Sequence, residues 1–251
     1  MTEERKIQTI KVAHGILYAV KDSRTASELA AEGKPVVGIL TEENQRDPFT
    51  GVSYLCGEEF LTDAKYLDRI YCRIMGIPWE ILQTTHCIVR ETVESDAKDF
   101  YRIYDDNDAR AYMEPLYEDP VKEERYLSQY RKNIYGYYEY GIWTVTDREN
   151  GNVIGRAGLD PVEIPGITKQ DETVPQLGYI IEKAYRGRGI AKEVCSGILH
   201  YGFTEYGFPA VYAMTHRDNT ASVQLLKKLQ FREKGPSKES PFYVLYEKAN
   251  Q

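Results

Sequence analysis

The residues best suited to chemistry lie between Leu177 and Ala191, where an apolar run leads into Arg-Gly-Arg-Gly-Ile-Ala, starting at Arg186. The apolar run predicts a strand, and the residues after Gly189 predict a helix. The first N–H groups of a helix lack partners within it, and the helix dipole adds positive charge there. Glycine lets the backbone approach an anion, and arginine adds charge and hydrogen-bond donors. The pattern predicts a site for a diphosphate.

A second candidate element follows the predicted strand 211–214. It reads Asn-Thr-Ala-Ser from Asn219 and precedes a leucine-rich helix predicted to end at Gln230. Asn219 has the side chain of a helix N-cap, which is a purely structural role. Its place beside the first element is also what a cofactor site requires. The residues alone leave both interpretations open, just as a surface turn remains an alternative for the first element.

Together the two elements resemble the GNAT superfamily of N-acetyltransferases. Its acetyl-coenzyme A motif has Gln or Arg, two residues, Gly, one residue, then Gly or Ala. Its second signature is Asn-x-x-Ser before a leucine-rich helix that ends near Gly-Phe, and Gln230 stands where that glycine is usual. The resemblance covers roughly residues 86–248 and is nearest to the ribosomal-protein N-acetyltransferases. The matching residues are Arg186, Gly189 and Ala191 in the first motif and Asn219, Ser222 and Phe231 in the second.

The resemblance implies a mixed sheet in which the strands 177–182 and 211–214 splay apart. The pantetheine arm of acetyl-coenzyme A would lie in that gap and pair with a strand edge. The pyrophosphate would bind backbone N–H groups at the start of the helix, and the thioester would face the second signature. The implied cofactor-binding residues are Ile180, Ile181, Arg186, Gly187, Arg188, Gly189, Ile190, Ala191, Asn219 and Ser222.

The implied reaction transfers acetyl from acetyl-coenzyme A to a primary amine of a small molecule or of a protein N-terminus. Direct attack in a ternary complex needs a base for the amine and a proton donor for the thiolate, but no covalent enzyme intermediate and no metal. Ser222 is the candidate donor, and Glu114, Asp160 and Glu172 are the candidate bases.

Two positions depart from the family pattern. Leu226 stands where relatives often carry a tyrosine, and Gln176 stands where many have a glutamate. These departures motivate an alternative function, an acyl-coenzyme A binding or sensing module without catalysis. A tyrosine-rich stretch, 126–140, is interpreted either as a wall of the acceptor pocket, where rings hold a cationic amine, or as packing.

The elements that must position these residues form two units. The length of 251 residues allows one or two domains. The first, residues 1–84, is predicted to be a small parallel β-α-β domain, with strands at 16–20, 36–41 and 52–56 and helices at 24–32 and 64–75. It has no glycine-rich loop after its first strand. Presenting the acceptor, forming a homodimer and covering a sheet edge are its candidate roles.

The second predicted domain, residues 85–251, alternates strands and helices, so we expect an α/β fold of the α+β, mixed-sheet kind. Residues 142–146 and 153–159 are predicted to form a hairpin. The remaining strands are expected at 86–92, 177–182, 211–214 and 242–247, and the helices at 95–104, 120–135, 189–206 and 220–230.

Composition narrows the partners and the location. The net charge of −7 disfavours nucleic acid, because proteins that bind it are usually basic. No apolar run approaches the roughly 20 residues that span a bilayer, and residues 1–9 lack the apolar stretch of a secretory signal. We therefore expect a cytoplasmic protein without a membrane partner. The four widely spaced cysteines are interpreted as buried free thiols.

Overall fold

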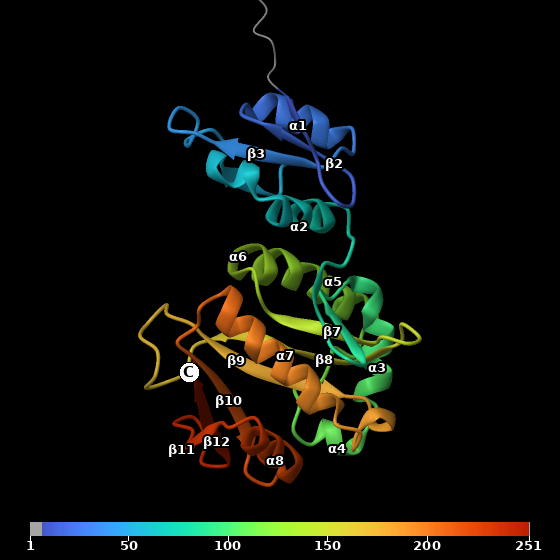
Figure 1. The fold of residues 1–251 in the computed structure, drawn as a ribbon, viewed down its shortest axis with the longest axis vertical. Helices are drawn as coiled ribbons and strands as arrows, with labels where there is room; N and C mark the ends of the chain where they lie inside the picture. The colour runs from blue at the N-terminus through green and yellow to red at the C-terminus, as the bar shows by residue number, and fades with distance from the viewer. Residues whose placement is uncertain (1–6, 251) are drawn as a thin grey trace, which may run out of the picture. The chain divides into compact units, whose positions relative to one another are not determined.

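The computed structural model describes residues 7–250 and contains two compact units. The first ends at Trp79 and the second begins at Glu80, whereas the sequence places the boundary after residue 84. The difference is one short strand, β5 (Glu80–Gln83), which pairs with β6 (Cys87–Arg90) and so belongs to the second unit. Figure 1 shows the elements of both units.

The first unit is built on a four-stranded sheet with the order β1-β2-β3-β4. The predicted β-α-β unit is confirmed, because β2 and β3 are parallel and α1 connects them. β1 was not predicted and adds an antiparallel edge. The elements are β1 Gln8–Lys11, β2 Ile16–Val20, α1 Ser23–Ala31, β3 Val36–Leu40, β4 Leu55–Gly57, a 3-10 turn Glu58–Thr62 and α2 Ala64–Ile74.

Helix α2 packs its apolar face on this sheet and also holds the turn before β2. Leu67 and Ile70 are fully buried in the core of the unit. Asp68, on the same helix, accepts the backbone N–H of His14 at 2.9 Å and lies 2.9 Å from His14 Nδ1. Cys72 Sγ lies within 4.8 Å of both groups. The His14–Asp68 pair therefore fastens the β1–β2 turn to the helix.

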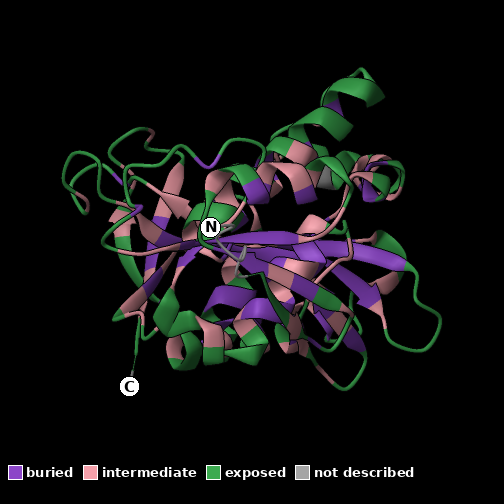
Figure 2. Ribbon diagram, turned by 90° about the horizontal axis from the view of Figure 1, so that it is seen from above, coloured by how far each residue is buried: buried purple, intermediate pink, exposed green. Residues whose placement is uncertain are grey.

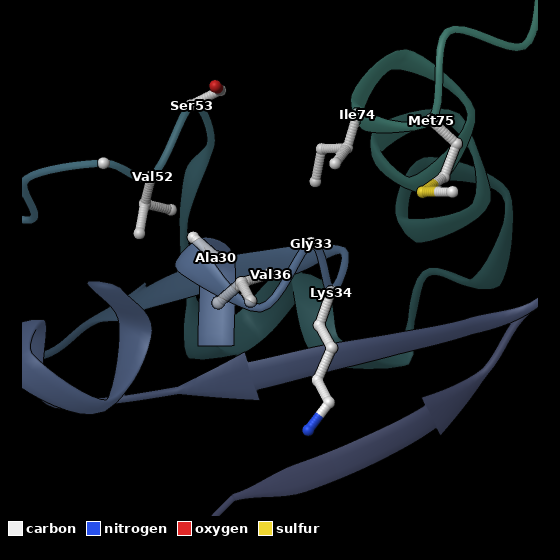
Figure 3. Close-up of a pocket in the computed structure, with 9 residues that line it drawn as sticks. Ala30, Gly33, Lys34, Val36, Val52, Ser53, Ile74 and Met75 are labelled. Carbon is white, nitrogen blue, oxygen red and sulfur yellow. The ribbon is translucent and has the colours of Figure 1, made fainter. Parts of the chain in front are cut away.

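A cavity of about 380 Å³ lies in the first unit, where the end of α2 faces the turn after α1 (Figure 3). Ile74 and Met75 line its α2 side. Lys34 supplies the cationic side chain of the lining, and its ammonium is paired with Glu32 at 2.7 Å and lies over the Tyr18 ring. None of the site residues predicted from the sequence lines this cavity.

The second unit is built on an eight-stranded sheet with the order β11-β12-β10-β9-β8-β7-β6-β5. Within the described residues β9 and β10 form its parallel pair, and the other neighbours are antiparallel, so the predicted mixed sheet is confirmed. The strands after β6 are β7 Ile142–Asp147, β8 Val153–Val162, β9 Val174–Ile181, β10 Ala210–His216, β11 Arg232–Pro236 and β12 Tyr243–Ala249.

Helices cover this sheet, and α7 lies across β8 and β9 (Figure 1). The central strands β7 and β8 are the most continuously buried segments, while most residues of the longer loops are exposed or half-buried (Figure 2). The helices are α3 Ala97–Tyr104, α4 Asn107–Arg110, α5 Pro120–Tyr130, α6 Gly136–Tyr138, α7 Ile190–Glu205 and α8 Thr220–Lys228, with 3-10 turns at Glu94–Asp96 and Lys183–Tyr185 and a π-helical turn at Arg131–Tyr135.

Two features of the second unit differ from the predicted elements. The single helix expected over 120–135 ends as α5 at Tyr130 and continues through the π-helical turn into α6. β11 was not predicted, because its sequence, Arg-Glu-Lys-Gly-Pro, is polar and exposed and lacks the alternation of a half-buried strand. Among residues 7–250, no helix combines the length and apolar character needed to cross a bilayer. All four cysteines are buried free thiols, as expected.

Candidate functional site

The helix α7 begins at a turn that the protein does not cap with a side chain. Gly189 is its N-cap residue, with φ +84°, and Gly187 has φ +76°. Both values lie in the left-handed region, which favours glycine. A Cβ at either position would meet no atom within 4 Å. These glycines are therefore required for backbone conformation, and the space in front of them is open.

The backbone donors at this turn are free. Among residues 7–250, nothing accepts a hydrogen bond from the N–H groups of residues 188–192, and the first partner appears where Glu193 N–H donates to Gly189 O. Arg188 lies over the Tyr185 ring and forms no ion pair within the described chain. Free donors, a helix dipole and an unpaired guanidinium converge here, so the turn can bind an anion such as a diphosphate.

A cavity of about 470 Å³ adjoins this turn. Tyr185, Arg188 and Ile190 line it from the β9–α7 connection. His86 and Asp147 line it from the ends of β6 and β7. A ligand held by the free N–H groups therefore has space beside it.

Arg186 has internal partners. Its Nε donates to Ile181 O at 2.8 Å, and its Nη1 donates to Asp106 Oδ2 at 2.5 Å. The Arg186 guanidinium holds the pKa of the Asp106 carboxyl below its usual range. The side chain thus braces the end of β9 against the loop before α4, and Arg188 is the arginine left available to an anion.

The sheet forks immediately before this turn. β9 pairs with β8 along its whole length but meets β10 at one register position, Gln176 with Tyr212. Beyond Gln176 the edge of β9 that faces β10 has no strand partner among the described residues. An extended ligand can pair with such an edge.

The register decides which backbone groups face the gap. Glu182 N–H donates to Ile154 O on the β8 side, so alternation turns the backbone groups of Ile180 toward β8 as well. Those of Tyr179 and Ile181 face the gap, although Ile181 O is taken by Arg186. Tyr179 therefore replaces Ile180 in the predicted free edge.

On the far side of the fork, α8 is capped by Asn219, whose Oδ1 accepts the N–H of Ser222 at 3.1 Å. Asn219 therefore has the structural role of an N-cap, and its hydrogen bond fixes Ser222 in the first turn of α8. Leu226, one turn further along, is buried in the core and offers no hydroxyl. Gln230 adopts φ +65°, so the backbone conformation usual for glycine occurs there without a glycine.

The three candidate bases do not all lie in the same part of the structure. Asp160 lies on β8 opposite Gln176, and Tyr130 donates a hydrogen bond to it at 2.7 Å. Burial raises the pKa of the Asp160 carboxyl, Tyr130 and the Arg156 guanidinium oppose that rise, and Glu114 adds to it. Glu114 is therefore close enough to Asp160 for its charge to act on that carboxyl.

Glu172 lies apart from this pair. Its carboxylate accepts the Lys169 N–H at 3.0 Å within the loop before β9, and the structure gives it no contact with Asp160 or Ser222 among the described residues. Its exposed carboxylate therefore has a local role in shaping that loop.

The two faces of the fork carry different groups. Side chains alternate along a strand, so Asp160 and Gln176 project to the face covered by α5, where Tyr130 lies. Tyr179 projects to the opposite face, toward Cys195 of α7 and Ser222 of α8. A group held in the gap would have a carboxylate on one side and hydroxyls on the other.

The tyrosine-rich stretch is largely packing. Tyr130, Tyr135 and Tyr140 are buried, and the first two form an edge-to-face ring pair. Tyr137 is exposed. Tyr130 also has a polar role, because its hydroxyl receives the Ile142 N–H as well as donating to Asp160.

Sequence reasoning missed Arg156 and Tyr179. Arg156 is buried, and its guanidinium lies 4.6 Å from the centre of the Phe100 ring. A polar residue four positions before Asp160 in an otherwise apolar strand was its available signal. Tyr179 gave no signal, since a tyrosine in a half-buried strand is ordinary.

Comparison with known proteins matches residues 86–232 to the acetyltransferase (GNAT) domain family. The N-acetyltransferase YoaA of Bacillus subtilis, itself uncharacterized, is 24% identical over 155 residues, 62% of this chain and 84% of that protein. The ribosomal-protein-S5-alanine acetyltransferase of Vibrio fischeri has a TM-score of 0.56 at 19% identity over 68% of this chain and 96% of its own.

A third similar structure is the ribosomal L7/L12 α-N-protein acetyltransferase RimL in complex with coenzyme A. Its TM-score is 0.50 at 14% identity, over 68% of this chain and 97% of its own. At these identities the two structural likenesses show a shared fold. The part of the chain that they cover is close in size to the second unit, which holds the fork and the uncapped turn.

Proposed function

The chain belongs to the acetyltransferase (GNAT) domain family and is an acyltransferase, and from that premise we propose that it transfers acetyl from acetyl-coenzyme A to a primary amine. The acceptor is a small molecule or a protein N-terminus. The observation that carries the proposal is the uncapped start of α7, whose N–H groups at residues 188–192 have no partner in the described chain.

In this proposal the pyrophosphate of the cofactor binds those N–H groups, and Arg188 adds a charge-assisted contact. The pantetheine arm extends along the free edge of β9, where Tyr179 and Ile181 present their backbone groups. Asn219 acts by fixing the first turn of α8, so that Ser222 faces the thioester. The cavity beside Arg188 and Ile190 leaves space near the phosphates. This arrangement would aim the thioester at the fork.

Three groups then serve the reaction. An attacking amine must lose a proton, and Asp160, with its raised pKa and its place at the fork, is the proposed base. The carbonyl oxygen gains negative charge, which a free N–H of the β9 edge stabilises. The departing thiolate takes a proton from Ser222. Glu114 sustains the raised pKa of Asp160 without itself contacting the amine.

The acceptor class is inferred from charge. Asp160 and Glu114 outnumber the Arg156 guanidinium on the α5 face of the fork, and the remaining negative charge suits an amine that arrives as an ammonium ion. Two of the similar proteins are named as acetyltransferases of ribosomal proteins. Protein N-termini are therefore the first acceptors to test. The charge of −7 over the whole chain suits a cationic acceptor equally.

The experiment combines calorimetry with acetyl-coenzyme A and an assay of free thiol release over a panel of amines that includes peptide N-termini and small polyamines. We expect a binding heat for the cofactor and thiol release that depends on the amine. The absence of cofactor binding would overturn the proposal. Binding without thiol release for any amine would favour the acyl-coenzyme A sensing module, for which the comparisons offer no support.

The first unit lies outside the family match, which begins at residue 86. We propose that it takes no part in cofactor binding, since every residue assigned to the cofactor lies between 179 and 222. Acceptor presentation, dimerisation and cover for a sheet edge remain its proposed roles. Thiol release with and without a competing fragment of residues 1–79 would detect acceptor presentation as a change in KM.

A further inference from the structure

We propose that Tyr179 is a positioning residue for Ser222: from β9, its hydroxyl donates a hydrogen bond to the Ser222 oxygen and directs the Ser222 proton at the sulfur of the leaving thiolate. This inference rests on the proposed acetyl transfer. Relatives often carry a tyrosine on the helix at the position where this chain has Leu226. The proposal places the corresponding hydroxyl on strand β9 instead.

The first observation is a buried hydroxyl without a partner. The Tyr179 oxygen is completely shielded from solvent, and it has no hydrogen-bond partner among the described residues. Leaving a buried polar group unpaired costs stability, and a phenylalanine would fill the same space without that cost. A hydroxyl retained under those conditions indicates a role beyond packing.

The second observation is what lies next to it. Burial raises the pKa of the Tyr179 phenol, the adjacent Ser222 hydroxyl opposes that rise, and Cys195 adds to it. Cys195 is completely buried, so Ser222 is the neighbour that can reach the gap. Ser222 lowers the pKa of the Tyr179 phenol as a hydrogen-bonding neighbour, but among the described residues no group meets strict hydrogen-bond distance and angle with the Tyr179 oxygen. A small shift of Ser222 when a ligand enters the gap would pair the two hydroxyls.

The third observation is a matching polar group on the other face. Gln176 Oε1 is also buried and unpartnered, and Gln176 is the residue at which β9 and β10 separate. Two unsatisfied polar atoms therefore bracket the fork, one on the α5 face and one on the α7 face. Apolar packing explains neither, and both lie where a polar ligand between the strands would pass.

The chemistry balances without a further reactant. The acceptor ammonium first loses one proton to water. The neutral amine nitrogen then bonds to the carbonyl carbon, and the carbon–sulfur bond breaks with its electron pair going to sulfur. Asp160 takes the proton lost by the amine, and Ser222 gives its proton to sulfur. Tyr179 keeps its own proton and stabilises the charge that develops on the Ser222 oxygen. After the products leave, water carries the proton from Asp160 and restores Ser222.

The test is a double-mutant cycle on thiol release, with acetyl-coenzyme A affinity measured by calorimetry. We expect Y179F to lower kcat about 10-fold and S222A about 100-fold, with KM and cofactor affinity within about 2-fold of wild type. Because Tyr179 acts through Ser222, the double variant should match S222A within about 2-fold. A structural role would instead lower kcat by the same factor in both backgrounds.

The matched control is Y212F. Tyr212, on the neighbouring strand β10, donates to Glu247 at 3.0 Å, so this variant removes a paired tyrosine hydroxyl from the same sheet. Its kcat should equal that of wild type. Y179F should melt no lower than wild type, because the hydroxyl it removes has no partner.

The outcomes distinguish the role of Tyr179 from the proposed acetyl transfer itself. If wild type releases thiol and Y179F is equally fast, or if the two single effects multiply, the role of Tyr179 is overturned while acetyl transfer stands. If wild type neither binds acetyl-coenzyme A nor releases thiol, acetyl transfer itself is overturned, and the assignment of Tyr179 is overturned with it.

Discussion

Each unit contains a strand that leads into a helix, and the two junctions end differently. In the first unit, β2 is followed by Asp22, whose carboxylate accepts the Thr25 N–H at 2.8 Å and caps α1. In the second unit, β9 leads through a 3-10 turn to Gly189, which has no side chain, and within residues 7–250 the first N–H groups of α7 have no acceptor. The order of elements is the same, but one helix start is satisfied by the protein and the other is open to a ligand.

The difference shows that a strand–helix junction offers its N–H groups to an anion only when the protein withholds its own cap. Asp63, Asp119 and Asn219 cap α2, α5 and α8 in the same way as Asp22 caps α1. A capped start has used a donor and, with aspartate, holds a negative charge that repels phosphate. Compared with these four capped starts, the glycine start of α7 combines free donors with an arginine that is unpaired within residues 7–250.

The largest effect is expected when the open junction is blocked. Gly189→Val places a branched side chain at φ +84° and displaces the N–H groups of the turn. We expect acetyl-coenzyme A affinity to fall about 100-fold or more, because each lost hydrogen bond to a charged group is worth about 1.5–3 kcal/mol. Isothermal titration calorimetry measures this affinity.

Its matched control is Gly33→Val, at the end of α1, where φ is +75° and a Cβ likewise meets no atom within 4 Å. The two substitutions impose similar backbone strain, of about 1–2 kcal/mol, on two different units. Gly33→Val should lower the melting temperature and leave the affinity unchanged. Equal losses of affinity in the two variants would contradict the open-junction argument.

The second-largest effect is expected at Asp160, a carboxylate that is assigned to the reaction and does not cap a helix. Asp160→Asn should lower kcat about 100-fold, the usual worth of a general base. In wild type, kcat/KM should fall as pH drops through the raised pKa of Asp160, because the protonated carboxyl cannot accept the amine proton. Steady-state rates across pH measure both.

The stability of the same variant provides the control. A carboxyl whose pKa is raised in the folded state destabilises the fold at pH values above that pKa, because burial costs the charged form more than Tyr130 and Arg156 return. Asp160→Asn removes the charge and can still accept from Tyr130. The free energy of unfolding at neutral pH should therefore not decrease. A large decrease would mean that the rate loss reflects unfolding.

A smaller effect distinguishes the two arginines of the open junction. Arg188→Ala should weaken acetyl-coenzyme A binding about 10-fold and reduce its salt dependence, because a charge-assisted contact with phosphate is lost. Arg186→Ala removes the brace to Ile181 and Asp106, so it should lower the melting temperature more than Arg188→Ala does. Titrations at two salt concentrations, with thermal melts, test this order.

The smallest effect on the site is expected at the capped junction. Asp22→Ala should cost about 1 kcal/mol of stability, the usual worth of an N-cap side chain. The affinity for acetyl-coenzyme A should not change, since α1 lies in the unit without assigned cofactor residues. Chemical denaturation and calorimetry on the same preparation suffice. Weaker cofactor binding would connect the first unit to the site.

Much of the fold was predictable, because its signals are local. The glycines and prolines that punctuate the chain, the N-cap at Asp22 and the alternating hairpin strands each depend on neighbouring residues. The missed strands β1, β5 and β11 are short and lie at sheet edges, where greater exposure weakens the alternation. The π-helical turn at Arg131–Tyr135 also escaped, because it keeps the composition of the helix around it.

The sequence by itself determined the motif: two glycines and two arginines before a helix, with no capping side chain at its start, predict a phosphate site. Tertiary structure alone decided the partners, pairing Arg186 with Asp106, 80 residues away, bringing Tyr130 to Asp160 and Tyr179 to Ser222. Strand register and helix packing fix such contacts between distant residues, and a one-residue shift in register reverses which side chains face the gap. No local pattern encodes that choice.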